Sequence, residues 1–111
     1  MTGENHVSYN PGLGRYIMGN YSFLDEEARP RPAHQLPYPY AAVRSQLTLF
    51  EAPNPWGPWS LFYRDDDWGT GDYQPSFPVK WMSNEGRTMY MVCSGGFDDY
   101  NFTVQRFDLT V

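Results

Sequence analysis

Tryptophan and tyrosine side chains are the residues of this chain whose chemistry points most directly to a ligand. The apolar C–H faces of sugar rings stack on such aromatic rings, while Asp, Asn and Arg side chains hydrogen-bond the sugar hydroxyls. A concave surface of this kind would hold a glycan, as in a lectin-like module. The candidate ligand-binding residues are Trp68, Trp56, Trp59, Tyr38 and Tyr40, with Trp81 as a further tryptophan.

The same aromatic residues also have a structural interpretation, because indoles commonly fill a core or the contacts between sheets. We expect most of the four tryptophans to lie in the core. Trp68 is the one expected to be exposed, since Asp67 and Gly69 flank it. The proline-rich segment 29–40 favours extended, polyproline-like backbone. Its tyrosines either clamp a ligand, latch onto a neighbouring subunit or belong to a spacer loop.

An acidic run at residues 65–72 resembles part of a calcium loop, because it combines alternate oxygen ligands with glycines. Position twelve of such a loop would be Ser76, which cannot supply the bidentate carboxylate of a glutamate. His6 and His34 have no second histidine or cysteine at ligand spacing, and Cys93 is the single cysteine. The sequence therefore predicts an acidic hairpin tip, no metal site and no cofactor.

Composition limits the class of protein. The 111 residues, with 41% hydrophobic and 18% aromatic content, predict one globular domain with a packed core. Thirteen acidic residues against eight basic ones disfavour a nucleic-acid partner, because phosphate binding needs a basic face. No apolar run reaches the ~18 residues that would span a membrane, and the N-terminus lacks the features of a signal peptide. We expect a soluble chain, cytoplasmic by default, with secretion left open.

Alternation of apolar and polar residues with period two recurs along the chain, and helical periodicity does not. The sequence thus predicts an all-β protein. Thr88–Ser94 is apolar on both faces, which predicts that sheets cover both of its sides. The expected strands, seven in number, are residues 7–9, 15–23, 46–51, 59–64, 75–83, 88–94 and 102–111.

Two turn signals divide the chain. Residues 51–59 hold three prolines, a glycine and two tryptophans, which predicts a sharp turn between two strands. Gly86 and Arg87 echo Gly14 and Arg15, and without the proline-rich insertion 25–40 the repeat is about 55 residues, close to a four-stranded blade with its loops. The sequence predicts a single domain, 1–111, of two antiparallel propeller-blade-like sheets: residues 1–74, and residues 75–111 without an outermost strand.

Several motifs resemble the C-terminal two blades of five-bladed β-propellers related to glycoside hydrolases. The likeness is greatest to a bacterial family of unknown function, some of whose members look like endo-acting arabinan hydrolases. It extends from about Tyr9 to Asp108, and the segment 52–59, Ala-Pro-Asn-Pro-Trp-Gly-Pro-Trp, is its most specific part. The other motifs are residues 9–16, 50–53, 77–81, 86–90 and 94–95. The resemblance implies a partial β-propeller, because this chain has the length of only two blades of five.

The resemblance also implies acidic residues around a central channel, most of them from blades that are absent here. Glycosidases use two facing carboxyl groups, about 5 Å apart for retention or roughly 6.5 to 9.5 Å for inversion. The catalytic candidates in this chain are Glu51, Asp98 and Asp99. Glu51 ends an apolar strand beside the tryptophan turn, where it could instead pair with an arginine or cap the turn. Asp98 and Asp99 would point to opposite faces of a strand, or belong to a solvated turn.

Two blades alone would expose an apolar sheet face and open strand edges. We therefore expect a homodimer or higher homo-oligomer, in which residues 104–111 could complete a blade of a partner. The alternative is a compact monomer in which the two sheets pack as a sandwich.

Three functions follow from these observations. The preferred one is a non-catalytic, propeller-derived binding module for carbohydrate that works as an oligomer. The reason is that the fold of the family can be recognised in this chain, whereas its set of catalytic residues cannot. The second is a glycoside hydrolase whose acidic site is assembled between subunits. The third is a structural remnant or fragment of a larger propeller, with no activity of its own.

Overall fold

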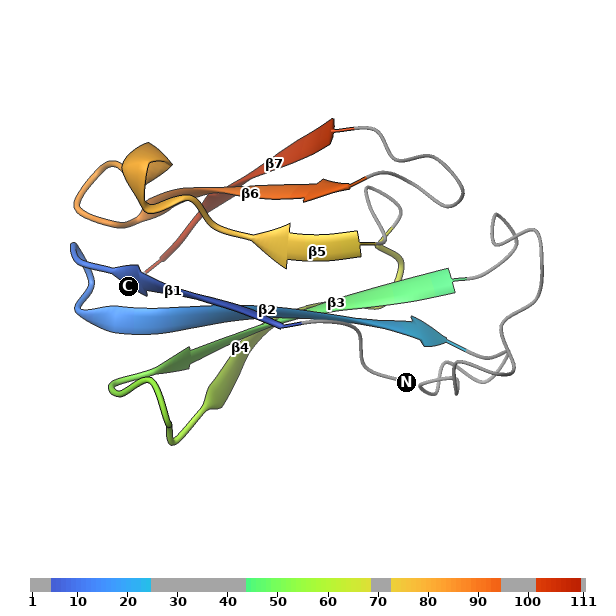
Figure 1. Ribbon diagram of the computed structural model, residues 1–111, viewed down its shortest axis with the longest axis horizontal. Coiled ribbons are helices and arrows are strands. Elements are labelled where there is room, and N and C mark those ends of the chain that lie inside the picture. Colours follow the sequence, from blue (N-terminus) through green and yellow to red (C-terminus); the bar gives the residue numbers. More distant parts are fainter. Residues whose placement is uncertain (1–4, 25–43, 69–72, 95–101, 111) are drawn as a thin grey trace.

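The computed structural model describes residues 5–24, 44–68, 73–94 and 102–110, and within them the chain forms two antiparallel sheets that lie one over the other (Figure 1). The strand order is β1-β2-β3-β4 in one sheet and β5-β6-β7 in the other. The prediction of an all-β protein is confirmed. The elements are β1 (His6–Asn10), β2 (Arg15–Leu24), β3 (Arg44–Ala52), β4 (Ser60–Asp65), β5 (Tyr73–Ser76), the 3₁₀ turn η3 (Val79–Trp81), β6 (Thr88–Ser94) and β7 (Phe102–Asp108).

The expected strands are found within one or two residues of their predicted bounds, with two exceptions. Residues 75–83 do not form one strand, because β5 ends at Ser76 and η3 follows. Pro75 lies within β5 and Pro78 follows it, and neither supplies an N–H group to a sheet ladder, so no continuous strand runs to residue 83. The last strand ends at Asp108, earlier than predicted.

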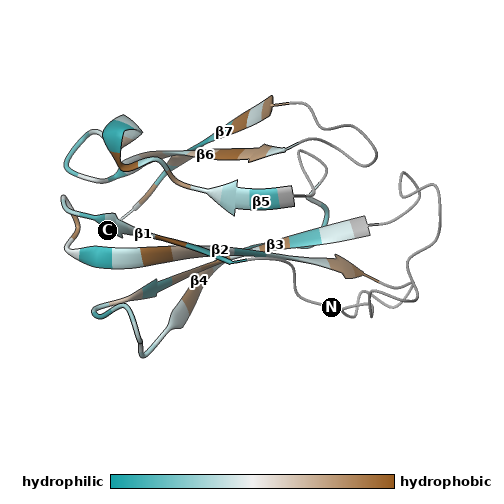
Figure 2. Cartoon of the chain, in the orientation of Figure 1, coloured by the Kyte–Doolittle hydropathy of each residue, from teal (hydrophilic) through white to brown (hydrophobic). Residues whose placement is uncertain are grey.

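One hydrophobic core lies between the sheets. Alternate residues of β2 and β6 point into it, as the period-two pattern requires. In Figure 2, β6 is largely brown and β2 carries brown segments between paler and teal ones. Edge-to-face contacts join the layers, with ring centroids 5.3 Å apart for Tyr63 and Phe107. The buried members are Ile17, Tyr21, Phe23, Leu47, Leu49, Trp68, Phe77, Met89, Met91, Cys93 and Phe107.

The prediction that sheets cover both faces of β6 is confirmed for one face only. Met89 and Met91 are fully buried against the four-stranded sheet. Tyr90 and Val92, on the other face, are only partly buried, and no strand among the described residues lies over them. The outer face of the three-stranded sheet is therefore accessible in the described part of the chain.

The two turns with similar sequences lie against each other at one end of the sheets. Asn10, at the end of β1, is fully buried, and its Nδ2 donates to the Gly86 carbonyl oxygen at 2.8 Å. Its Oδ1 accepts from the Leu13 N–H at 3.1 Å. A Cβ atom on Gly12 would collide with the backbone of Glu85. The amide of Asn10 and the small size of Gly12 therefore fix how closely the two sheets approach.

A second seam joins the sheets along β1 and β5. The Ser8 Oγ donates to the Phe77 carbonyl oxygen at 2.8 Å. Behind it, a Cβ atom added to Gly19 of β2 would lie 3.3 Å from the Pro75 carbonyl oxygen. Close backbone approach is a common reason for glycine within a strand. The sheets are therefore joined by hydrogen bonds as well as by apolar packing.

Replacement of Asn10 by alanine tests the joint between the turns. Asn10→Ala leaves the Gly86 carbonyl and the Leu13 N–H without their partner, and we expect the free energy of unfolding to fall by about 1–3 kcal/mol. Asn54→Ala is the control, because the Asn54 side chain donates only a long, 3.4 Å bond to the Gly57 carbonyl within its own turn. Chemical denaturation of both variants measures the difference, and equal losses would contradict a special role for Asn10.

Candidate functional site

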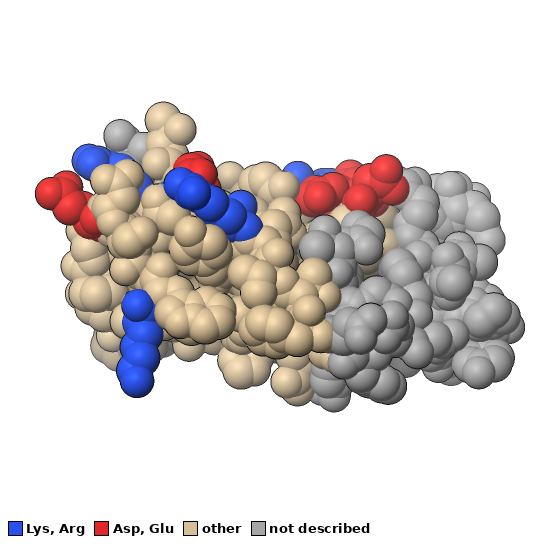
Figure 3. Space-filling view, turned by 90° about the horizontal axis from the view of Figure 1, so that it is seen from above, with Lys and Arg blue, Asp and Glu red and all other residues tan. Residues whose placement is uncertain are grey.

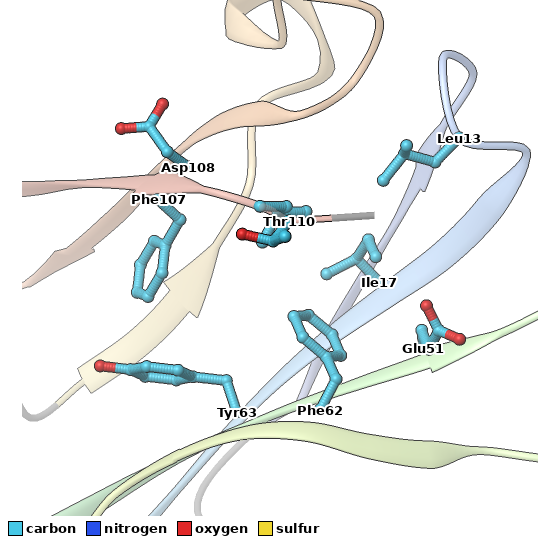
Figure 4. A pocket seen from close by; sticks show the side chains of 9 residues that line it. Leu13, Ile17, Glu51, Phe62, Tyr63, Phe107, Asp108 and Thr110 are labelled. Atoms are coloured by element: carbon cyan, nitrogen blue, oxygen red, sulfur yellow. The ribbon is translucent and has the colours of Figure 1, made fainter.

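A cavity of about 360 Å³ opens between the sheets at the end where the two turns meet (Figure 4). Its walls come from both sheets, so it exists only when the sheets are packed together. Most of its lining is apolar, with two carboxylates and a threonine hydroxyl among the polar groups. The lining residues are Leu13, Ile17, Glu51, Phe62, Tyr63, Phe107, Asp108, Leu109 and Thr110.

The aromatic wall of the cavity depends on an irregularity in β4. Leu49 pairs with Tyr63, but Phe50 pairs with Leu61, so Phe62 is an extra residue in the ladder. Neighbouring residues of a regular strand point to opposite faces, whereas a bulge breaks that alternation. Phe62 and Tyr63 consequently both reach the cavity, where Phe107 faces them from β7 (Figure 4).

The two carboxylates lie on opposite sides of the cavity (Figure 4). Glu51 lies beside Ile17, its register partner in β2. Asp108 is held from outside the cavity: Arg106 Nε lies 3.0 Å from its Oδ2, and the Thr88 hydroxyl donates to its Oδ1 at 3.0 Å. The hydrogen bond from Arg106 and then that from Thr88 lower the pKa of the Asp108 carboxyl, so this group is ionised at neutral pH.

Tyr63 has the opposite electrostatic environment. Burial in the wall of the cavity, followed by the negative charge of Asp65, raises the pKa of its phenol. The neutral phenol is therefore retained at all physiological pH values, and its O–H remains a hydrogen-bond donor. The ring of Tyr63 lines the cavity while its hydroxyl extends away from Phe62 and Glu51 (Figure 4). The polar groups of the cavity are then the Thr110 hydroxyl, which can donate or accept, and the Glu51 carboxylate, which accepts.

The predicted exposure of Trp68 is wrong. Trp68 is 1% exposed and packs in the core, with its ring centroid 6.3 Å from that of Tyr21. Two hydrogen bonds join its backbone to Ser45. The Trp68 N–H donates to the Ser45 carbonyl oxygen, and the Ser45 hydroxyl donates to the Trp68 carbonyl oxygen. The indole Nε1 donates to Gln105 Oε1 at 3.3 Å. These bonds turn the chain inward directly after the acidic run.

The expectation that most tryptophans lie in the core is also wrong, because Trp68 alone among the four is buried. Trp56 is 80% exposed in the loop between β3 and β4, Trp81 is exposed, and Trp59 is partly buried. None of the tryptophans lines the cavity. Of the other candidates, Glu51 lies at the cavity, and Tyr38, Tyr40, Asp98 and Asp99 lie outside the described residues.

In the described part of the acidic run that resembles a calcium loop, Asp65 and Asp66 accept hydrogen bonds from neighbouring protein groups. Arg64 forms a two-pronged ion pair with Asp66, with bonds of 2.7 and 2.9 Å, and Gln46 Nε2 donates to the same carboxylate at 2.7 Å. Asp65 accepts from the Asp67 N–H at 2.9 Å. Across the described ranges, no group of three or more His, Cys, Asp or Glu side chains is placed to hold a metal ion.

Sequence reasoning did not identify the residues that form most of the cavity. Phe107 and Asp108 belong to an expected strand, and alternation predicts that they face opposite sides. Nothing in the sequence signals the bulge that brings Phe62 to the same side as Tyr63.

Comparison of the chain with protein-family models, curated proteins and solved structures found no significant match. In the described part of the chain, no helix has the length and apolar character needed to cross a membrane.

The contrast between buried and exposed tryptophans gives a direct test. We expect Trp68→Ala to lower the free energy of unfolding by about 3–5 kcal/mol, because it empties a large site in the core. Trp56→Ala is the matched surface control and should change it by less than about 0.5 kcal/mol. Denaturant titration measures both, and a small effect at Trp68 would contradict its burial.

The Asp108 carboxylate predicts a pH dependence. A folded-state pKa below the unfolded value, about 3.9, stabilises the fold above that pH, and this contribution is lost as the pH falls through the folded pKa. Melting of wild type and Asp108→Asn should therefore differ at neutral pH and converge in strong acid. In a carboxyl NMR titration, Arg106→Gln should raise the pKa of Asp108 toward its ordinary value, and an unchanged pKa would exclude Arg106 as the main cause.

Proposed function

We propose that this chain is a non-catalytic binding module for a carbohydrate and that the cavity between the sheets is its binding site. The observation that carries the proposal is a cavity with aromatic walls and hydrogen-bonding groups at its margins. Its volume of about 360 Å³ lies within the roughly 300–1,000 Å³ of small-molecule sites. A terminal sugar unit or a short oligosaccharide end fits this description better than a long chain.

The lining supplies both kinds of contact that sugars need. The C–H face of a ring would stack on Phe62, which is partly exposed at the mouth, while Phe107 closes the inner wall. Sugar hydroxyls would donate to the Glu51 carboxylate and exchange hydrogen bonds with the Thr110 hydroxyl. Aromatic stacking and a charged acceptor on different walls would orient the ring, because each contacts a different part of it.

The exposed Trp56 extends this proposal beyond the cavity. It belongs to the loop that follows Ala52, the last residue of β3. Its side chain is largely exposed, with 80% of its surface accessible. An exposed indole offers a platform on which a further sugar unit can stack. We assign Trp56 a secondary binding role: its loss should weaken the binding of oligosaccharides and leave the binding of monosaccharides unchanged.

Binding is better supported than hydrolysis. A glycosidase needs an acid with a raised pKa facing a second carboxylate. Asp108 has the opposite property, since Arg106 lowers the pKa of its carboxyl, and its carboxylate points away from the cavity (Figure 4). Glu51 is then the one carboxylate aimed at a ligand among the described lining residues. A hydrolase assembled between subunits would have to bring its second acid from another copy of the chain.

We further infer that the two sheets are propeller-type blades. Each sheet is a meander whose strands neighbour each other in chain order, as they do in a blade. The first sheet has four strands and the second has three, which fits a second blade without its outer strand. Neighbouring blades of a propeller pack face to face, and these two sheets share one core in that manner.

A glycan array followed by calorimetry tests the binding function. We expect wild-type protein to bind at least one class of oligosaccharide on the array, and Phe62→Ala and Glu51→Gln each to weaken that binding about tenfold or more. Trp81→Ala is the control, because Trp81 is also exposed but does not line the cavity.

Two results would overturn the proposal. One is the absence of binding to every glycan on the array at millimolar protein concentration. The other is release of reducing sugar from a bound oligosaccharide, which would make the module an enzyme.

A further inference from the structure

The strand β7 presents an open edge that can pair with another strand. Among the described residues it is the outermost strand of its sheet. The Leu109 N–H donates to the Arg87 carbonyl oxygen, and the β6–β7 register continues from there with Thr88 opposite Asp108. In an antiparallel ladder, hydrogen-bonded and non-hydrogen-bonded pairs alternate. The backbone N–H and C=O groups of Phe102, Val104, Arg106 and Asp108 therefore point away from β6, toward the open edge.

The other outer strands carry features that block such pairing. β5 is short, contains Pro75 and has an irregular register. β4 contains the bulge at Phe62. β1 is held alongside β5 by the bond from Ser8 to the Phe77 carbonyl, and it also contacts η3. Proteins commonly protect sheet edges by such devices, or by proline and lysine.

β7 has none of these protections. Its seven residues, Phe-Thr-Val-Gln-Arg-Phe-Asp, include no proline, glycine or lysine, and all seven pair with β6 in one unbroken register. Its outer face is apolar at one end, where Phe102 is 71% and Val104 is 45% exposed. Seen from above, the described surface carries few charges, which gather mostly along one margin and leave a broad uncharged area (Figure 3).

The sequence of β7 is complementary to itself in one antiparallel register. A two-fold axis at Val104 would place this residue opposite its own copy, where the two exchange both backbone hydrogen bonds. Phe102 would then lie opposite Arg106 of the partner subunit, which allows a cation–π contact on the outer face. No like charges oppose each other in the pairs from Phe102 to Arg106. A C₂ interface requires this kind of self-complementarity.

We propose that two copies of this chain pair through β7 in antiparallel register about Val104, which joins their three-stranded sheets into one six-stranded sheet. A second copy fits this edge because the register about Val104 places Phe102 opposite Arg106 of the partner subunit and sets no like charges against each other. Each subunit would keep its own cavity, which is lined by residues 107–110 and so lies beyond the paired segment 102–106. The inference does not depend on the ligand of the cavity.

Substitution of the central valine tests this interface. Val104→Lys places two ammonium groups opposite each other, and like charges at such a site destabilise pairing. We expect the dimer dissociation constant to rise at least about tenfold, since like-charge juxtaposition in an interface costs several kcal/mol. Val7→Lys is the matched control, because Val7 is also on an outer strand and is 46% exposed, against 45% for Val104. Sedimentation across a dilution series measures both, with circular dichroism to verify folding.

A cysteine variant tests the register independently. The Cα atoms of a hydrogen-bonded antiparallel pair lie about 5.5 Å apart, within the roughly 4.4–6.8 Å range of disulfides. Mild oxidation of Val104→Cys should give a covalent dimer, whereas Val7→Cys should not, and the native Cys93 is buried. A wild-type monomer at every concentration, or equal dimerisation of Val104→Lys and wild type, would overturn the proposal. A monomer that instead binds an added β7 peptide without dimerising would also refute pairing between two whole chains.

Discussion

The buried side-chain amide of Asn10 is the interaction on which the arrangement of the two sheets depends. It bonds the turn between β1 and β2 to the turn before β6, across 76 positions of sequence. The same side chain orders Leu13, which lines the cavity. On the other turn, the Arg87 carbonyl accepts from Leu109, another lining residue. Because a buried amide must satisfy its donors and acceptors, the turns cannot slide without cost, and the mouth of the cavity is fixed by their contact.

Chemistry at this cavity follows from how its two carboxylates are held. Arg106 and Thr88 satisfy Asp108 on the outer side, so its charge is neutralised away from the space that a ligand would occupy. Glu51 faces that space from the opposite wall. Two acids used in such different ways suit recognition of hydroxyl groups better than proton transfer between them. The bulge at Phe62 adds a ring to the same space, and the site therefore depends on one extra residue in β4.

Period-two patterning predicted most strands of this protein, because burial alternates along much of β3, β6 and β7 and the turns carry proline and glycine. It was insufficient where backbone irregularity decides the outcome. β5 ended at Ser76, shortly before Pro78, whereas the pattern extended this strand to residue 83. Trp68 appeared exposed beside Asp67, but its backbone bonds to Ser45 and its indole bond to Gln105 draw it inward. These bonds join residues far apart in sequence, and local patterns carry no information on such contacts.

Native-state hydrogen exchange tests most directly whether the turn contact makes the two sheets one cooperative unit. Amides of β2 and β6 lie in different sheets and are joined through the shared core and through Asn10. If the sheets unfold together, their slowest amides should exchange with the same opening free energy and the same denaturant dependence. If β6 and β7 exchange at a distinctly lower free energy than β2 and β3, the three-stranded sheet opens by itself, and the joint between the turns does not hold the molecule together.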